Sequence, residues 1–448
     1  MLSKPTLLVC GWMLLCLSTT LQAEPSINSD QNHSGAAEPI YAASSPDINL
    51  QDAIARTFEH NPALRAFSYA LKAQSGRQLQ AGLAASPEIS LDIEDALGSG
   101  PFDGIDNAQM TLGIAWVLEG DIRQSHSDVA RGGAALLSTQ ATIKRLDAAA
   151  QTARLYVLSL ANQARLGNAL KTVALAEETV HVVNKRVSAG KTPGAELARA
   201  RAELARRQLA HEDIEHELRS AIRLLAAQWG ETQPGFARVE GDIFTLPATL
   251  PFTTLPLTTL KAQFERSPNF TRLMSEKSLR QAQLTLAQSQ SNPPWRVNLG
   301  LRHFETTNDQ ALVAGISLPF GERSRNTGNI IAAQENLSQT VAQTDALKVR
   351  FETMLYVLSE ELQHSLHRIG AYRSDIIPQL EEALKQTRKA YNLGRYSYLE
   401  WRSAQAELLD ARSAIVEASV EAHLKMIEIE RLTGVSMKKL TQPATDKN

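Results

Sequence analysis

Hydrophobic residues follow two different spacings along the chain, and these spacings alternate in a fixed order. Between Ile48 and Leu83 they recur at three- and four-residue intervals, which predicts a helix that Pro62 interrupts. Two stretches of strict apolar–polar alternation follow, and they predict strands. Long stretches with apolar residues at every seventh position come next. The pattern therefore predicts a short helix, two strands and two long helices.

This whole order of elements occurs twice. The pentapeptide Leu-Tyr-Val-Leu-Ser occupies both 155–159 and 355–359. Gly190 and Glu196 return as Gly394 and Glu400 at the same separation. Because several matches keep the same order and a nearly constant offset, the chain contains an internal duplication.

The two copies leave shorter segments between and around them. Lys4 precedes an apolar stretch that ends at a small residue, Ala23, as in a cleaved export signal. The ends beyond the copies are poor in apolar residues, which predicts mobility. The predicted organisation is a signal peptide (1–23), an N-terminal arm (24–47), a first structural repeat (48–246), a Pro-marked linker (247–256), a second structural repeat (257–434) and a C-terminal tail (435–448).

The alternating stretches predict two strands in each copy. Each approaches the ~9–11 residues with which a tilted strand crosses a bilayer. One face of the sheet would be apolar, and the other would carry Asp92, Glu94, Asn298 and Arg302. The predicted strands lie at about 88–96, 108–118, 295–304 and 310–320.

Four strands leave two unpaired edges, and unpaired edges cannot face lipid because no water satisfies their backbone groups. The sheet must therefore stay out of the membrane or close with other subunits. Twelve strands from three chains would form a barrel with an apolar exterior and the polar side chains in its lumen. The long helices would continue from the barrel as a tube.

The two long helices of each copy are joined by a glycine-centred reversal. The stretch from Asp121 to Ala189 contains no proline and predicts a helix of roughly 100 Å. Pro378 predicts a bend in the corresponding helix of the second copy. The hairpin tips contain Gly190, Pro193 and Gly194 in the first copy and Gly394 and Arg395 in the second.

Composition excludes several classes of protein. The net charge is −2 and the pI is near 6.6, which gives no basic field for nucleic acid. Aromatic residues make up only 5% of the chain, whereas helix formers are abundant, as is typical of long helices and coiled coils. Both cysteines, Cys10 and Cys16, lie within the signal.

We find no pattern that predicts catalytic, cofactor-binding or metal-binding residues. His211 and His216 surround two glutamates, but they are five residues apart, whereas a zinc-protease motif needs four. His364 and His367 share a helix face and lack a third ligand. An enzyme and a bound cofactor are therefore not expected.

The signal, the duplication, the strand pairs and the Gly-centred hairpins together resemble the TolC-type outer-membrane efflux proteins over about 48–434. The stretch from Ile316 to Gly321, followed by Arg325-Asn326 and Gly328-Asn329-Ile330, is similar to their metal-efflux (CzcC-like) branch. The resemblance implies a homotrimer, mainly helical with a small β part, in the outer membrane of a Gram-negative bacterium. A 12-stranded barrel in outer-membrane lipid would continue as a periplasmic helical barrel. The duct would passively conduct heavy-metal cations from a periplasmic adaptor protein and an inner-membrane pump of the proton-driven RND type.

In the resembled family the periplasmic entrance lies at the hairpin tips, which also contact the adaptor. A tyrosine and an acid hold it closed, and Tyr391 and Glu400 match their spacing from Gly394. Ser403 replaces a second acid of that pattern, and Glu196 repeats Glu400 in the first copy. Three copies would bring these carboxylates into a ring that attracts cations. Alternatively, both glutamates only stabilise helix N-termini.

Two other functions are compatible with parts of the pattern. A duct of the same fold could serve drug efflux or type I protein secretion, because the pump selects the substrate. A periplasmic coiled-coil scaffold without a pore would need no alternating strands, and the four strands therefore favour the duct.

Overall fold

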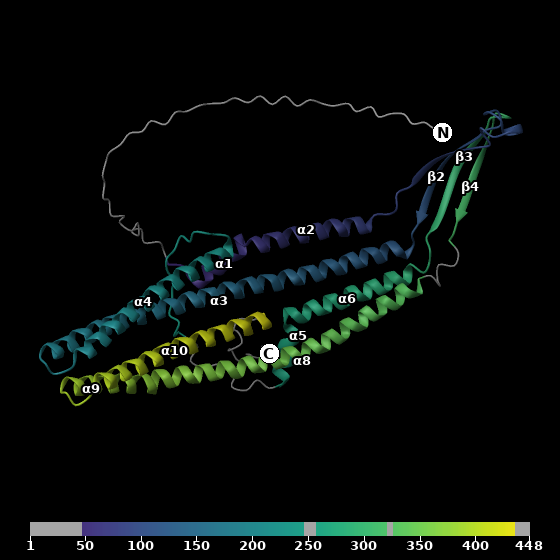
Figure 1. The fold of residues 1–448 in the computed structure, drawn as a ribbon. Coiled ribbons are helices and arrows are strands. Elements are labelled where there is room, and N and C mark those ends of the chain that lie inside the picture. Colours follow the sequence, from purple (N-terminus) through teal and green to yellow (C-terminus); the bar gives the residue numbers. More distant parts are fainter. Residues whose placement is uncertain (1–46, 246–256, 320–325, 435–448) are drawn as a thin grey trace, which may run out of the picture. The chain divides into compact units, whose positions relative to one another are not determined.

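A computed structural model describes residues 47–245, 257–319 and 326–434. The predicted signal peptide, the linker and the C-terminal tail lie outside the described residues, as does the N-terminal arm up to residue 46. The described part is mainly helical and contains one four-stranded antiparallel sheet (Figure 1). This confirms the predicted fold class.

Each repeat contributes two strands and a set of helices in the same order. The first repeat contains α1 (Leu50–His60), α2 (Pro62–Gly82), β1 (Glu88–Glu94), the short 3₁₀ helix η1 (Gly100–Phe102), β2 (Gln109–Leu118), α3 (Asp121–Ser188), α4 (Gly194–Ala226) and the 3₁₀ turn η2 (Ala227–Trp229). The second contains α5 (Leu257–Arg266), α6 (Pro268–Ser289), β3 (Trp295–Phe304), β4 (Asp309–Ser317), α8 (Thr327–Ala371), the π-helical turn η3 (Tyr372–Ile376), α9 (Ile377–Asn392) and α10 (Tyr398–Thr433).

The two repeats start their second helices in the same way. The Asn61 side chain accepts hydrogen bonds from the Ala63 and Leu64 amides, and Pro62 occupies the first turn of α2. In α6 the Ser267 hydroxyl caps the Phe270 amide, again with a proline in the first turn. A capping side chain followed by proline is a strong signal for the start of a helix. Amide hydrogens in the first turn have no partner within the helix, and proline has no amide hydrogen to leave unpaired.

The sheet has the order β1-β2-β3-β4, so the repeats meet where β2 pairs with β3. Leu112 lies opposite Leu91 on one side and Leu301 on the other. Strand β1 ends at Glu94, two residues before the predicted end, because Asp95 adopts a φ of 58° that terminates the extended backbone.

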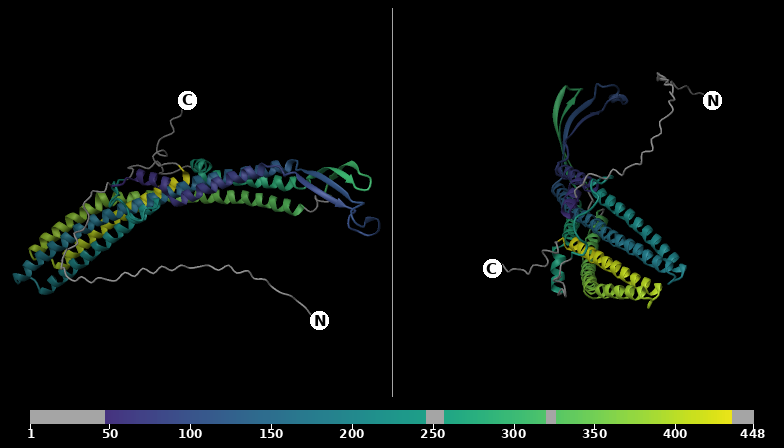
Figure 2. Two further views of the ribbon diagram at one scale, coloured as in Figure 1. Left: turned by 90° about the horizontal axis from the view of Figure 1, so that it is seen from above. Right: turned by 90° about the vertical axis from the view of Figure 1, so that its left-hand side faces the viewer.

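Helix α3 spans 68 residues and contacts α2 and α4 of its own repeat and α6 and α10 of the other. Figures 1 and 2 show α4 beside the part of α3 that leads to the hairpin tip, whereas Figure 1 shows α2 along the other part of α3. The glycine pair in α3 permits a close helix crossing, since a Cβ on Gly132 would lie only 3.2 Å from the Leu279 Cα of α6. The repeats are thus packed together along helices as well as across the sheet.

Three apolar clusters form the core of the described part of the chain. One lies in the second repeat around Phe264, Phe351 and Leu362. Another lies in the first repeat around Tyr156 and Trp229. The third lies near the hairpin tips and combines residues of both repeats, including Val183, Ala200, Tyr391, Tyr398 and Trp401.

The long helix of the second repeat changes its hydrogen-bonding pattern just before Pro378. Residues Tyr372–Ile376 form a π-helical turn between α8 and α9. Proline has no amide hydrogen and its ring displaces the carbonyl one turn earlier, so the preceding turn widens instead of breaking. The Arg373 Nη2 atom donates to the Phe244 carbonyl 3.1 Å away and holds this turn against the first repeat.

Among the described helices, none is both long enough and apolar enough to cross a bilayer.

Candidate functional site

Both hairpin tips reverse direction at a glycine with a left-handed backbone. The φ angles are 67° at Gly190 and 73° at Gly394. Each glycine amide donates to the carbonyl three residues earlier, at 2.9 Å in both tips. Pro193 and Gly194 then lead into α4, with Pro193 at its N-cap. The glycines are explained by the backbone geometry of the turn, because residues with a Cβ rarely adopt this φ.

The tips are joined by a hydrogen bond between the two repeats. The Tyr391 hydroxyl on α9 donates to Oε2 of Glu196 on α4, at 3.1 Å. The Thr192 hydroxyl donates to the same oxygen at 2.6 Å. Tyr391 is 1% exposed, although it lies only three residues before Gly394 at the turn. The structure therefore brings two of the three predicted gate residues into contact.

Aromatic packing surrounds the Tyr391 ring. The Trp401 ring of α10 lies 5.0 Å away between centroids, and its side chain is fully buried. Val183 of α3 and Ala200 of α4 complete this cluster from the first repeat. The tip of the second hairpin is thus packed against the first hairpin and is not free in solution.

The environment of Tyr391 keeps its phenol protonated. Burial and the negative charge and hydrogen bond of Glu196 raise the pKa of Tyr391 to about 12. The Arg186 charge and the Thr192 hydroxyl act in the opposite direction but do not offset these effects. At neutral pH Tyr391 is therefore a hydrogen-bond donor.

Glu400 has a different role from Glu196 in this structure. Its carboxylate accepts from the Ser397 amide at 2.7 Å and from the Ser397 hydroxyl at 2.9 Å. The Ser397 hydroxyl in turn accepts from the Glu400 amide, which completes a capping box at the start of α10. Hydrogen bonds from the Ser397 backbone and side chain lower the pKa of Glu400. The contacts of Glu400 thus agree with the alternative interpretation, in which this glutamate stabilises a helix N-terminus.

Arg186 is a tip residue that the sequence did not reveal. Its Nη1 atom donates to the Tyr391 carbonyl at 2.8 Å and to the Asn392 carbonyl at 3.0 Å. Its guanidinium carbon also lies 4.7 Å from the centroid of the Tyr391 ring. A basic residue in the last turn of a helix is common, so only the position of α9 distinguishes Arg186 from other arginines.

The four predicted lumen residues lie on one face of the sheet. Arg302 forms an ion pair with Glu94 at 2.7 Å and donates to the Thr111 hydroxyl at 2.9 Å. Asp92 lies opposite Thr111 and accepts from the Ser90 hydroxyl. Asn298 faces Gly315, where an added Cβ would lie 2.5 Å from its Oδ1 atom. The antiparallel register, rather than sequence proximity, brings these residues together.

The opposite face of the same sheet is apolar and open. Ile89 is 78% exposed, Leu112 59% and Leu312 78%. An exposed apolar surface of this extent on a sheet marks a site of contact with lipid or with another protein. The exposed apolar side chains of this face are Ile89, Leu91, Ile93, Met110, Leu112, Trp116, Leu118, Trp295, Leu299, Leu301, Leu312 and Ile316.

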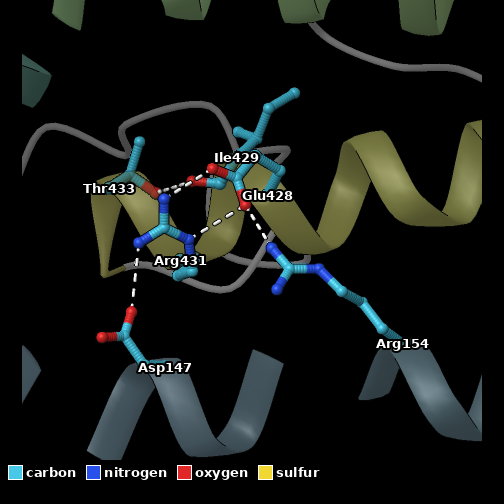
Figure 3. A network of polar contacts seen from close by, with 6 residues as sticks. All are labelled: Asp147, Arg154, Glu428, Ile429, Arg431 and Thr433. Carbon is cyan, nitrogen blue, oxygen red and sulfur yellow. Dashed lines mark hydrogen bonds and ion pairs between the residues drawn. The ribbon is translucent and has the colours of Figure 1, made fainter. Parts of the chain in front are cut away.

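Away from the tips, a charged network joins α3 to α10 (Figure 3). Glu428 accepts from Arg154 of α3 at 2.5 Å and from Arg431 of its own helix at 2.6 Å. Arg431 also reaches Asp147 of α3 at 3.1 Å. Partial burial opposes ionisation of Glu428, but the hydrogen bonds and charges of Arg431 and Arg154 still lower its pKa. The network attaches the last helix of the second repeat to the first repeat.

Within the part of the chain that the structure describes, no group of three or more His, Cys, Asp or Glu side chains is arranged to hold a metal ion. Figure 3 and the tip contacts instead show carboxylates that are paired with arginines, hydroxyls and backbone amides.

The two-faced sheet, the heptad helices and the paired hairpin tips define the fold of an outer-membrane efflux channel. Residues 53–231 match the outer membrane efflux protein family, so this region carries an outer membrane efflux protein domain. The resemblance to the TolC-type proteins is thereby confirmed.

Relatives over most of the chain agree with this domain. The cobalt-zinc-cadmium resistance protein CzcC of Cupriavidus metallidurans is 25% identical over 387 residues, which cover 86% of this chain and 90% of CzcC. The nickel and cobalt resistance protein CnrC of the same organism is 24% identical over 291 residues, covering 64% of this chain and 67% of CnrC. The crystal structure of the outer membrane protein VceC from Vibrio cholerae has the same fold, with a TM-score of 0.72 at 20% identity, over 87% of this chain and 96% of VceC.

Proposed function

We propose that this protein is the outer-membrane exit duct of a tripartite heavy-metal efflux system. The observation that carries the proposal is the sheet, which has an exposed apolar face, a charged face and two unpaired edges. Backbone groups at the edges of β1 and β4 need partners in lipid, so the sheet closes with sheets of other copies. Three copies supply the twelve strands of a barrel, with Asp92, Glu94, Asn298 and Arg302 in its lumen.

The substrate class is proposed from the relatives. CzcC and CnrC are named for resistance to cobalt, zinc, cadmium and nickel. The duct itself performs no chemistry, and a pump supplies the cations through an adaptor protein. We assign the pump to the proton-driven RND type and place adaptor contact at the tips, around Gly190, Pro193, Gly194, Gly394 and Arg395.

The entrance is closed at the hairpin tips. The Tyr391–Glu196 hydrogen bond ties the second hairpin to the first and is the contact that must break when the tips separate. Glu400 supports this closure indirectly, because it caps the helix that carries Trp401. Three such tips around one axis narrow the periplasmic end of the tube.

The proposal is tested with the detergent-extracted outer-membrane protein. Its mass in detergent and its conductance in a planar bilayer are measured, and a deletion strain is tested for growth in cobalt, zinc, cadmium and nickel. A trimer with a small, cation-selective conductance and a metal-sensitive deletion strain support the duct. Sensitivity to drugs or loss of a secreted protein, without metal sensitivity, would indicate the same duct with another cargo. A monomer without conductance would leave the coiled-coil scaffold.

A further inference from the structure

We infer that Arg186 is the positioning residue of the closed entrance, holding Tyr391 in place so that its hydroxyl reaches Glu196. The inference rests on the proposed duct and adds a residue to its gate. It starts from an asymmetry between the copies, since Arg186 lies four residues before Gly190, and Ala390 lies four residues before Gly394. An arginine at this place occurs in the first repeat alone.

The guanidinium binds carbonyls at the end of α9, where the helix offers few backbone donors. The carbonyls of Tyr391 and Asn392 belong to the last turn of this helix, and both accept from Nη1 of Arg186. The C-terminal end of a helix carries partial negative charge, which a cation stabilises. Arg186 also reaches the turn itself, because a Cβ on Gly394 would lie 3.7 Å from its Nη2 atom.

The same guanidinium lies against the ring whose hydroxyl makes the gate contact. The 4.7 Å distance to the Tyr391 centroid places it within range of a cation–π interaction. Arg186 therefore holds Tyr391 at its backbone carbonyl and at its ring, while Glu196 binds the hydroxyl. Loss of Arg186 would free the backbone and the ring of Tyr391, so the hydroxyl would no longer be held within reach of Glu196.

A second arginine provides a matched control. Arg388, one turn before Tyr391, also joins α9 to α3, through an ion pair with Glu178. Both side chains of that pair are 42% exposed, and its acceptor is a carboxylate on the surface. Exposed pairs of this kind contribute little, so Arg388→Gln removes an α3–α9 arginine contact without releasing the tip.

The test compares Arg186→Gln, Arg186→Lys and Arg388→Gln in the full-length protein. Planar-bilayer conductance reports opening, and acrylamide quenching of Trp401, taken as the difference from a Trp401→Phe background, reports tip packing without needing a pore. Arg186→Gln is expected to raise conductance several-fold and to raise quenching. Arg186→Lys should have a smaller effect, since lysine keeps the positive charge but lacks the planar guanidinium with its several donors. Arg388→Gln should match the unaltered protein in both measurements.

Coupling to Tyr391 separates a positioning role from a general loss of stability. Tyr391→Phe added to Arg186→Gln should raise conductance no further than the larger single effect, because both act through one contact. Conductance and quenching unchanged in Arg186→Gln, or additive effects in the double variant, would overturn the inference. If no variant conducts, the proposed duct fails, and the quenching comparison still decides whether Arg186 holds the tip.

Discussion

The hydroxyl of Tyr391 lies 3.1 Å from a carboxylate oxygen of Glu196, and these residues belong to different copies of the duplicated unit. Tyr391 precedes the turn of one hairpin, whereas Glu196 follows the turn of the other. Two hairpins that descend from one ancestral unit thus meet through residues that are not equivalent. In the proposed duct, closure of the entrance would depend on this difference between the copies.

We expect Tyr391→Phe to raise the conductance of the duct several-fold, because it removes the hydroxyl that ties α9 to α4. Glu196→Gln should have a similar effect, since a neutral amide is a weaker acceptor than a carboxylate. Single-channel conductance in planar bilayers measures both. Glu400→Gln should have a smaller effect than Glu196→Gln, because Glu400 binds Ser397 of its own helix start and supports the tip only through the helix that carries Trp401. A large increase in conductance for Glu400→Gln, without one for Glu196→Gln, would show that Glu400 and not Glu196 holds the entrance closed.

Adjacent residues on β1 should respond oppositely to a new positive charge. Leu91 is 59% exposed on the apolar face, and Leu91→Lys there costs about 2–4 kcal/mol near the middle of a bilayer. We expect this variant to reduce the amount of folded trimer in outer-membrane fractions. Asp92→Lys, on the charged face, should leave that amount unchanged and lower the preference for cations over anions. Equal losses for the two variants would argue against lipid on the apolar face.

The network around Glu428 should contribute more to stability than a similar pair on the same two helices. Glu428→Gln leaves Arg154 and Arg431 without their shared carboxylate, which we expect to cost about 2 kcal/mol. Glu417→Gln breaks the Arg165 pair, whose carboxylate is 52% exposed, and should cost less than about 1 kcal/mol. Denaturant unfolding in detergent measures both.

The pH dependence of that network has a defined direction. Because the folded protein lowers the pKa of Glu428, its stabilisation is present above 4.5, the ordinary pKa of a glutamate. It is lost as the pH falls below that value and the carboxylate is protonated. The difference in unfolding free energy between the native protein and Glu428→Gln should therefore shrink in this acid range. A difference that stays constant down to pH 3 would contradict it.

His423 should make the protein sensitive to milder acid. Its Nε2 lies 3.0 Å from the Ile243 carbonyl, and burial lowers its pKa, although that carbonyl and Asp242 oppose the change. The unfolded chain therefore binds a proton near pH 6.5 that the folded chain resists, and stability falls as the pH drops below this value. Each unit of pKa lowering corresponds to about 1.4 kcal/mol. Thermal unfolding at pH 7.5 and 5.5 should show a larger decrease for the native protein than for His423→Gln.

Periodicity in the sequence predicted most of the fold because the spacing of apolar residues follows from the backbone geometry of each helix and strand. Alternation of apolar residues predicted a sheet with two different faces, and the described strands have them. The Asn61-Pro62 and Ser267-Pro268 pairs start helices through contacts within a few residues. The candidate site was harder to predict from the sequence, since Glu196 and Glu400 occupy equivalent places in the repeat. Their different hydrogen bonds depend on which helix lies beside each one.

The pentapeptide that occurs twice shows what the sequence and the tertiary structure each determine. The letters alone specify a helical segment with an apolar side, and both copies are helical. In the first copy Tyr156 is buried and donates to the Ile48 and Glu240 carbonyls, whereas Tyr356 in the second is 57% exposed. Leu355 instead points into the core of the second repeat.

Local sequence thus determined the elements, their order and the hairpin turns, because those depend on spacing and backbone conformation. The tertiary structure decided which identical side chains are buried, why Arg186 reaches Tyr391, and which glutamate meets it. Such contacts join residues about 200 positions apart, and they depend on packing between helices that local patterns do not encode.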